Sequence, residues 1–326
     1  MAATIYEVAA LAGVSPATVS RTLNGVPVSP EYADKVREAA KALDYRPNRT
    51  ARTLRRRSSE VIALIIPDIE NPFFTALARG VEDRALAANF SVVLCNTDDQ
   101  LSKETRYLDV ALSENMAGVI LAPASVSTDL DAILARKTPV VAVDRSSRYD
   151  IDTVLMDNGN GGRTATTILY ERGFARVACI TGPREVQTAQ QRAAGWREVF
   201  TARSPRANPD NYIRYTNYRV DGGRAAMAEL LRMRHPPDAV FVANNLMSVG
   251  ALQHLFEVRK QPPAIGLASL GDLPFPTWET PGVSIVPWPA RRLGVQAADL
   301  LLARINGDDG PARTVVTDST ADVDPP

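Results

Sequence analysis

The chain has 326 residues, of which 45% are apolar and 23% charged, as in globular proteins with more than one domain. Its apolar segments are too short to span a bilayer, and its apolar content is too high for a disordered protein, so both classes are excluded. The 37 basic and 37 acidic side chains give a formal net charge of zero. Taken as a whole, the charge therefore argues for no polyanionic partner.

The charges are distributed unevenly along the chain. Positions 1–57 carry ten basic and five acidic side chains, a net charge of +5, and positions 58–326 carry the other 27 basic and 32 acidic ones, a net charge of −5. A basic N-terminal part joined to an acidic body indicates nucleic-acid binding at one end. On charge alone, a solvated charged surface is the simpler explanation.

Three short helices are predicted in the first 45 residues. Thr4 and Glu7 have the spacing of a capping box in front of the first helix. Ser15-Pro16 and Ser29-Pro30 each combine an N-cap residue with a proline at the first helical position, so the second and third helices are expected to begin there. Two short helices joined by a glycine-containing turn, with a third to close the core, form a helix-turn-helix arrangement.

The outer face of the second predicted helix carries short or positively charged side chains: Ser15, Ala17, Thr18 and Arg21. Small side chains allow close approach to a DNA groove, and an arginine can reach a base edge or a phosphate. A three-helix mini-domain with an ordinary polar surface is the alternative.

Residues 46–60 contain six arginines and a single large apolar residue, Leu54. This segment cannot build a core of its own. It is either a basic linker or a helix that folds only against a polyanion. In the second case, Leu54 is placed to act as an apolar wedge between base steps of a minor groove.

From Val61 onward, short apolar runs alternate with helical patterns. The runs fall into two series: 61–66, 91–94, 118–121 and 140–143, then 177–180, 212–215, 239–243 and 264–268. Continuous apolar strands separated by helices predict parallel sheets covered on both faces. We therefore expect an α/β body of two doubly wound lobes with a ligand between them, and a helix over 291–305 that packs back on one lobe.

Motifs for catalysis are missing from the sequence. There is no Gly-x-Ser-x-Gly elbow and no phosphate-binding Gly-x-x-x-x-Gly-Lys motif, and Asn158–Gly162 indicates a chain crossing and a helix start. The two histidines, His235 and His254, have no cysteine at ligand spacing. We therefore predict no catalytic residue, no metal and no cofactor, and a binding function instead of an enzyme.

Cys95 and Cys179 lie in apolar runs and are predicted to be buried thiols in a reducing compartment. The N-terminus lacks a secretory signal. Together these features predict a cytoplasmic protein.

Four stretches of the chain carry a family resemblance: Thr4–Ala9 with Ala12–Asn24, Tyr45–Asn48 with Ala51–Leu54, Ile66–Phe74, and Val242–Ala251. In these stretches the chain resembles the lactose repressor/galactose repressor (LacI/GalR) family of bacterial transcription regulators. The resemblance implies a helix-turn-helix DNA-binding headpiece over 1–46, a hinge helix or linker over 47–60, and a core over 61–326 like a periplasmic sugar-binding protein. By the same resemblance, the first lobe takes about 61–158 plus 287–310, the second takes about 159–286 plus the C-terminal segment, and the chain crosses between them near 158–162 and 285–291.

The resemblance also implies which residues contact DNA. Ser15 to Asn24 would form the recognition helix, with Pro16 and Ala17 at the base-choosing positions, where both lack a hydrogen-bond donor. Residues 48–56 would form the hinge helix, with Leu54 as the wedge that kinks a pseudo-palindromic operator bound by a homodimer or a higher oligomer. The implied DNA-binding residues are Thr4, Tyr6, Ser15, Pro16, Ala17, Thr18, Ser20, Arg21, Asn24, Asn48, Ala51, Arg52, Leu54 and Arg55.

The effector site that the resemblance implies comprises Phe73, Phe74, Asp144, Arg145, Arg192, Tyr218, Asn244 and Asp272. Plain core packing is the alternative for one of the two phenylalanines. Two positions depart from the family pattern, because Gly271 and Asn245 stand where acids are usual. A sugar or sugar derivative is the expected effector, and the loss of two acids leaves an anionic or phosphorylated ligand as an alternative.

The sequence thus predicts a repressor whose operator affinity is controlled allosterically by a small molecule. A solute-binding protein of a transport system shares the two-lobed core, but it would carry a signal peptide and no headpiece. An enzyme built on the same lobes is the third possibility, and turnover of a cleft ligand would support it.

Overall fold

The computed structural model describes residues 3–23, 26–45, 59–273 and 281–318. The chain divides into two compact units, residues 1–59, here called the headpiece unit, and residues 60–326, here called the body.

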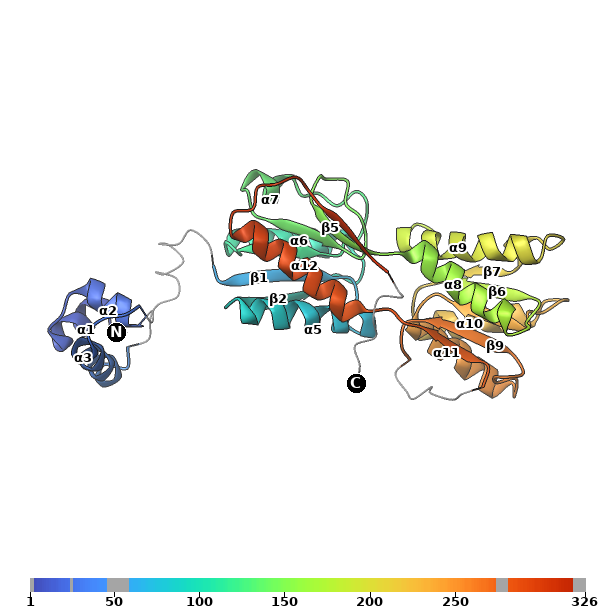
Figure 1. The fold of residues 1–326 in the computed structure, drawn as a ribbon, viewed down its shortest axis with the longest axis horizontal. Helices are drawn as coiled ribbons and strands as arrows, with labels where there is room; N and C mark the ends of the chain where they lie inside the picture. Colours follow the sequence, from blue (N-terminus) through green and yellow to red (C-terminus); the bar gives the residue numbers. More distant parts are fainter. Residues whose placement is uncertain (1–2, 24–25, 46–58, 274–280, 319–326) are drawn as a thin grey trace. The chain divides into compact units, whose positions relative to one another are not determined.

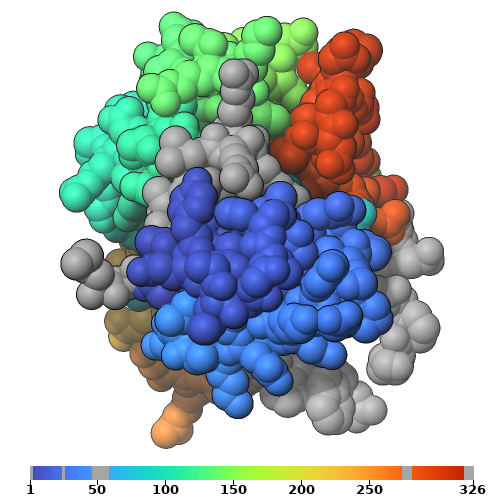
Figure 2. Space-filling model, turned by 90° about the vertical axis from the view of Figure 1, so that its left-hand side faces the viewer, coloured from blue at the N-terminus to red at the C-terminus, as the bar shows by residue number. Residues whose placement is uncertain are grey.

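The headpiece unit contains three helices, α1 (Ile5–Ala12), α2 (Pro16–Leu23) and α3 (Pro30–Ala42), which pack into a small core (Figures 1 and 2, dark blue). The predicted capping box is confirmed, because Glu7 Oε2 accepts from the Thr4 amide at 2.6 Å while Thr4 Oγ1 accepts from the Glu7 amide at 3.3 Å. Val8, Val19 and Val36, one from each helix, are fully buried. The helix-turn-helix arrangement is therefore held by a small apolar core to which all three helices contribute.

The first lobe of the body is built on a parallel sheet of six strands in the order β11-β5-β4-β3-β1-β2. Its strands are β1 (Val61–Ile66), β2 (Ser91–Asn96), β3 (Gly118–Leu121), β4 (Val140–Val143), β5 (Asp152–Met156) and β11 (Thr314–Thr317), and its helices are α5 (Pro72–Ala87), α6 (Leu101–Ser113), α7 (Asp131–Ala135) and α12 (Ala290–Ile305). Ile62, Leu64 and Ile66 pack in the same apolar cluster as α5 and α12, whereas Ala63 and Ile65 pack with α6 and α7. The continuous apolar pattern of β1 is thus explained by helices on both faces of the sheet.

The second lobe has a parallel sheet of five strands in the order β10-β9-β8-β6-β7. Its strands are β6 (Val177–Thr181), β7 (Ile213–Tyr215), β8 (Ala239–Val242), β9 (Gly266–Leu270) and β10 (Val283–Val286), and its helices are α8 (Asn158–Glu171), α9 (Gln187–Arg203), η1 (Pro209–Asn211), α10 (Val220–Leu231) and α11 (Asn245–Glu257). The chain passes between the lobes from β5 to α8 and from β10 to α12 (Figure 1). The predicted burial of both cysteines is also confirmed.

One part of the predicted division is wrong. The C-terminal segment was expected on the second lobe, but β11 pairs in parallel with β5 and so extends the first sheet, with Val315 opposite Val154. The physical reason is that α12 packs against α5 and leaves the chain beside the β5 edge. Arg304 and Arg313, on either side of the connection, then both bind the buried carboxylate of Asp152, the first residue of β5.

None of the helices in the described ranges combines the length and the apolar run that a bilayer crossing needs.

Candidate functional site: a cavity between the lobes and a helical DNA-binding face

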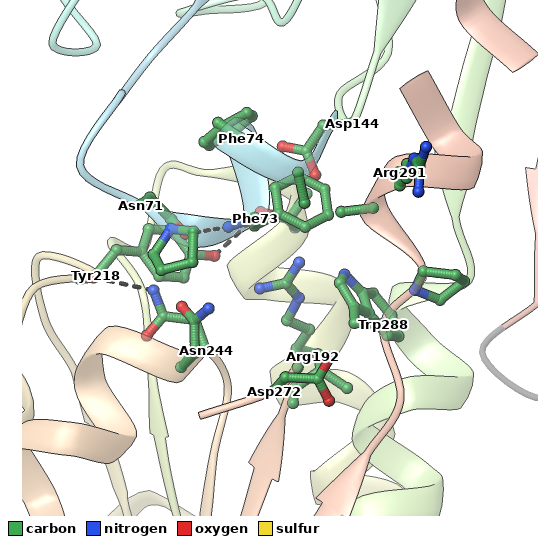
Figure 3. A pocket seen from close by; sticks show the side chains of 18 of the residues that line it. Asn71, Phe73, Phe74, Asp144, Arg192, Tyr218, Asn244, Asp272, Trp288 and Arg291 are labelled. Atoms are coloured by element: carbon green, nitrogen blue, oxygen red, sulfur yellow. Dashed lines mark hydrogen bonds between the residues drawn. The ribbon is translucent and has the colours of Figure 1, made fainter. Parts of the chain in front are cut away.

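A cavity of about 370 Å³ lies between the two lobes of the body, where the strands of both sheets end (Figure 3). Side chains from both lobes line it. All eight residues predicted for the effector site are among them: Phe73, Phe74, Asp144, Arg145, Arg192, Tyr218, Asn244 and Asp272. The fold therefore brings together residues that are distant in the sequence. The two outermost of the eight, Phe73 and Asp272, are 199 positions apart.

Two aromatic rings enter the cavity from the start of α5, directly after β1. Asn71 is the N-cap of this helix, and its Oδ1 accepts from the Phe73 amide at 3.0 Å. The rings of Phe73 and Phe74 meet edge to face with centroids 5.0 Å apart. Phe74 is buried, while Phe73 is only partly buried and offers its ring to the cavity (Figure 3). Core packing therefore describes Phe74 better than Phe73.

Asp144 and Arg145 reach the cavity from a tight turn after β4. The Arg145 amide donates to the Val143 carbonyl at 2.7 Å, and Asp144 has a φ of +67°, so the turn is a γ-turn centred on a left-handed residue. Such turns are rare and strained, and strain of this kind concentrates at binding sites. Burial raises the pKa of Asp144 above its ordinary value.

Arg145 is almost fully buried and makes a charge-assisted network at the side of the cavity. Its Nη1 donates to Asp99 Oδ1 at 2.6 Å and to the Pro123 carbonyl at 3.1 Å. Its Nε lies 3.6 Å from Asp144 Oδ2. The positive charge of Arg145 is therefore compensated by the carboxylates of Asp99 and Asp144.

Arg192 comes from α9, and its guanidinium lies in the middle of the view in Figure 3. Its Nε donates to Asn158 Oδ1 at 2.7 Å, and its Nη1 donates to the Ala243 carbonyl at 2.8 Å. Its Cζ lies 5.9 Å from the ring centre of Tyr218 and 5.4 Å from that of Trp288. These contacts fix the plane of the guanidinium between two aromatic rings.

Tyr218 and Asn244 close the second-lobe side. Tyr218 has a φ of +59°, and its hydroxyl lies 3.0 Å from Thr188 Oγ1. Asn244 donates from Nδ2 to the Tyr218 carbonyl at 2.9 Å and caps α11 by accepting from the Met247 amide at 2.8 Å. Burial raises the pKa of Tyr218, so its phenol is neutral at ordinary pH.

Several lining residues are not predicted from the sequence, and Trp288 is the most important. It lies on the crossing from β10 to α12, is 8% exposed, and packs against Gly161, where an added Cβ would meet its ring at 2.7 Å. An aromatic residue between two prolines, Pro287 and Pro289, at an expected lobe crossing was a signal for this position. The other lining residues with polar side chains that were not predicted for the site are Asn71, Thr188, Asn245 and Arg291.

The headpiece unit presents the predicted DNA-binding face of α2. Ser15, Ala17 and Arg21 are exposed, as are Thr4 and Tyr6 near α1, while Pro16, Thr18 and Ser20 are partly exposed. Ser15 Oγ accepts from the Thr18 amide at 3.1 Å and so begins the helix. The remaining predicted DNA contacts lie outside the described residues: Asn24, Asn48, Ala51, Arg52, Leu54 and Arg55.

Within the described ranges, no group of three or more His, Cys, Asp and Glu side chains has the arrangement of a metal site.

A helix-turn-helix unit and a two-lobed parallel-sheet unit with a ligand-sized cavity, carried by one chain, define the class of ligand-binding DNA-binding regulators. Residues 4–48 match the bacterial regulatory proteins of the lacI family, and residues 59–322 match the periplasmic binding proteins and sugar binding domain of the LacI family. The chain belongs to this family and is a sequence-specific DNA-binding transcriptional regulator.

Individual relatives agree with this assignment. The chain is 34% identical over 309 residues to the ribose operon repressor of Escherichia coli (strain K12), with 93% of each chain covered. It is similar to the solved complex of the transcriptional regulator CelR with cellobiose, at 29% identity and a TM-score of 0.72 over 97% of each chain. Its fold is also that of the lac repressor dimer bound to operator and the anti-inducer ONPF, with a TM-score of 0.82 at 24% identity over 98% of this chain and 97% of that one. The predicted fold class is thereby confirmed.

Proposed function

We propose that this protein is a repressor whose operator affinity is set by a sugar or sugar derivative bound between the lobes of the body. The observation that carries the proposal is the cavity itself, which joins aromatic faces and fixed polar groups from both lobes in a chain with a helix-turn-helix unit. Aromatic rings pack on the apolar faces of sugar rings, and carboxylate, amide and guanidinium groups bind their hydroxyls. The names of the relatives, a ribose operon repressor and a regulator–cellobiose complex, support the same class of ligand.

Control of DNA binding would follow from a shift between lobe arrangements. Arg219 of the second lobe binds Asp68 at 3.3 Å and Glu70 at 3.2 Å in the first lobe, and Ser146 donates from Oγ to Gln187 Oε1 across the lobes at 2.8 Å. A ligand that touches both lobes favours the arrangement in which these contacts form. Because the coupling is reciprocal, operator DNA must change the affinity for the ligand by the same factor.

We infer that the protein acts as a homodimer on a pseudo-palindromic operator. β2 is an edge strand of the first sheet, and its apolar side chains Val93 and Leu94 are 40% and 38% exposed. Leu86 of α5, the helix that packs on β2, is 67% exposed. An unpaired edge with exposed apolar residues is typical of a subunit contact. In such a dimer, two headpieces would read the two half-sites and Leu54 would act as a wedge at the centre.

The function is tested by binding of the full chain to a library of palindromic DNA at fixed salt, with and without sugars that raise its thermal stability. We expect one preferred operator and a ligand that changes the affinity for it. An absence of sequence preference would refute the DNA-binding part, and a ligand that binds without affecting DNA would refute the control. We propose binding without turnover, so a chemical product from any bound ligand would favour an enzyme.

A further inference from the structure

The cavity contains a buried positive charge that forms no salt bridge with a described residue. Arg192 is 7% exposed, and both of its hydrogen-bond acceptors, the Asn158 amide oxygen and the Ala243 carbonyl, are neutral. No carboxylate of the described residues lies within 4.0 Å of its nitrogens, whereas Arg145 has two such carboxylates nearby. Buried charges in proteins are normally paired, so the site is poised to receive a negative charge.

The unsatisfied polar atoms around the cavity are also all donors. Among the described residues, four buried side-chain atoms have no hydrogen-bond partner, and the two that belong to lining residues are Arg145 Nε and Trp288 Nε1. Both are N–H groups. A ligand that fills the cavity therefore has to supply acceptors for these two donors.

The amide side chains increase this excess of donors. The Oδ1 atoms of Asn71, Asn244 and Asn245 already accept from backbone amides at the starts of α5 and α11, at 3.0, 2.8 and 2.9 Å. The NH2 groups of Asn71 and Asn245 remain available, since neither makes a hydrogen bond to a described residue. Neutral residues of the lining thus offer mainly N–H groups to a ligand.

The carboxylates of the lining offset Arg192 only in part, because its charge acts on Asp144 without a salt bridge between the two side chains. Asp144 is buried beside Arg145, and Asp272 is exposed. Position 271, where the family usually has an acid, is a glycine with a φ of +86°, and a Cβ there would lie 3.6 Å from the Trp288 Cβ. Gly271 and Trp288 are therefore neighbours, and position 271 supplies no carboxylate to the lining.

Building on the function proposed above, we propose that the effector carries an anionic group, a carboxylate or a phosphate, that binds Arg192. The ligand is a sugar acid or a sugar phosphate of monosaccharide size, because 370 Å³ is near the lower end of the range of about 300–1,000 Å³ for small-ligand pockets. Figure 3 shows the Arg192 guanidinium in the space bounded by Phe73, Tyr218 and Trp288. Its Nη2 makes no hydrogen bond to a described residue and is left for the anion, while the rings of Phe73 and Trp288 pack on the carbon skeleton.

The test compares neutral sugars with their charged counterparts on the full chain. Calorimetry is run with D-ribose and D-ribose 5-phosphate, and with D-glucose, D-gluconate and D-glucuronate, together with operator binding in the presence of each. We expect at least one charged ligand to bind at least about tenfold more tightly than its neutral parent, as for a charge-assisted hydrogen bond. Equal or tighter binding of the neutral sugars, or no binding of any charged one, overturns this inference.

Three variants test whether Arg192 is responsible for the preference for a charged ligand. Asn245→Asp keeps the oxygen that accepts from the Leu246 amide and adds a negative charge to the lining, so it should lower the affinity for the charged ligand about tenfold and leave the fold intact. Arg192→Gln should remove the preference for the charged ligand. Arg224→Gln is the matched control, because Arg224 lies outside the lining, is exposed and pairs with Glu257 at 2.9 Å, and this variant should keep the preference. An unchanged preference in Asn245→Asp contradicts the proposal.

The proposed function and this inference fail in different ways. A neutral sugar that binds tightly and changes operator affinity leaves the repressor function standing and rejects the anionic effector. Charged ligands that bind through Arg192 but never change operator affinity reject the allosteric control while the assignment of the anion site holds.

Discussion

At the scale of single residues, the most constrained ion cluster lies outside the cavity. The side chain of Asp152 is fully buried at the start of β5 and accepts hydrogen bonds from Arg304 at 2.8 Å, from Arg313 at 3.0 Å and from the Arg313 backbone amide at 2.7 Å. Although burial opposes ionisation, these hydrogen bonds hold the pKa of Asp152 well below its ordinary value. One carboxylate thereby joins β5 to both ends of the connection between α12 and β11.

We expect Asp152→Asn to lower the free energy of unfolding by about 3 kcal/mol at pH 7, because it leaves two arginines beside a neutral amide. A carboxylate with a lowered pKa contributes stability above its unfolded pKa of about 3.9, and this contribution is lost as the pH falls through the folded pKa. Denaturant unfolding should therefore show a constant difference in the free energy of unfolding between wild type and variant from pH 7 to about pH 4, and a smaller difference from there down to pH 3. A gap that is widest in acid would contradict this assignment.

Gly182 determines the position of a cavity ring. A Cβ at Gly182 would lie 2.1 Å from Tyr218 Cζ, so the tyrosine ring rests on the glycine backbone. We expect Gly182→Ala to displace the ring and weaken ligand binding about tenfold, while operator binding without ligand is retained. Gly159→Ala is the control, since its nearest neighbour would be 3.8 Å away. Equal ligand affinity in the two variants would show that the ring is not part of the binding surface.

At the scale of elements, the sequence predicted those strands whose apolar runs are continuous. The buried runs 61–66, 118–121, 140–143 and 177–180 all lie in strands. The three missed strands, β5, β10 and β11, are short and interrupted by polar residues, and β5 begins with an aspartate that is stable in the interior only because arginines from the far end of the chain bind it. Such strands depend on partners that no local pattern shows. The same holds for Trp288, which reaches the cavity only because two lobes meet at its crossing.

The hinge helix or linker implied over 47–60 would connect the DNA-binding unit to the body, and its residue Leu54 allows a specific test. If Leu54 acts as a wedge in the operator, Leu54→Ala should weaken binding to the best palindrome by at least about tenfold and leave nonspecific binding nearly unchanged. Val126→Ala, an exposed apolar site of the body, should leave both affinities unchanged. Titrations against operator and scrambled DNA at one salt concentration measure the two affinities. An equal loss of affinity for both DNAs would mean that Leu54 contributes to folding or to nonspecific contact and does not act as a wedge.

At the scale of the whole molecule, the control proposed above depends on the bridges between the two lobes of the body. Arg219 is 44% exposed, so its ion pairs with Asp68 and Glu70 are screened by solvent and are worth at most about 1 kcal/mol. A bridge this weak can bias the balance between lobe arrangements without locking it, as a ligand-controlled equilibrium requires.

We expect Arg219→Ala to weaken ligand binding by no more than about fivefold, with a smaller difference from the wild type at high salt. Arg224→Ala is the matched control, because Arg224 is 53% exposed and pairs with Glu257 inside the second lobe at 2.9 Å. Ligand affinity is measured with and without operator, and operator affinity with and without ligand. In each protein the two ratios must agree, since coupling is reciprocal, and the ligand affinity of the free protein should change only in the Arg219 variant. An equal loss in both variants would mean that the bridge between the lobes has no special part in ligand binding.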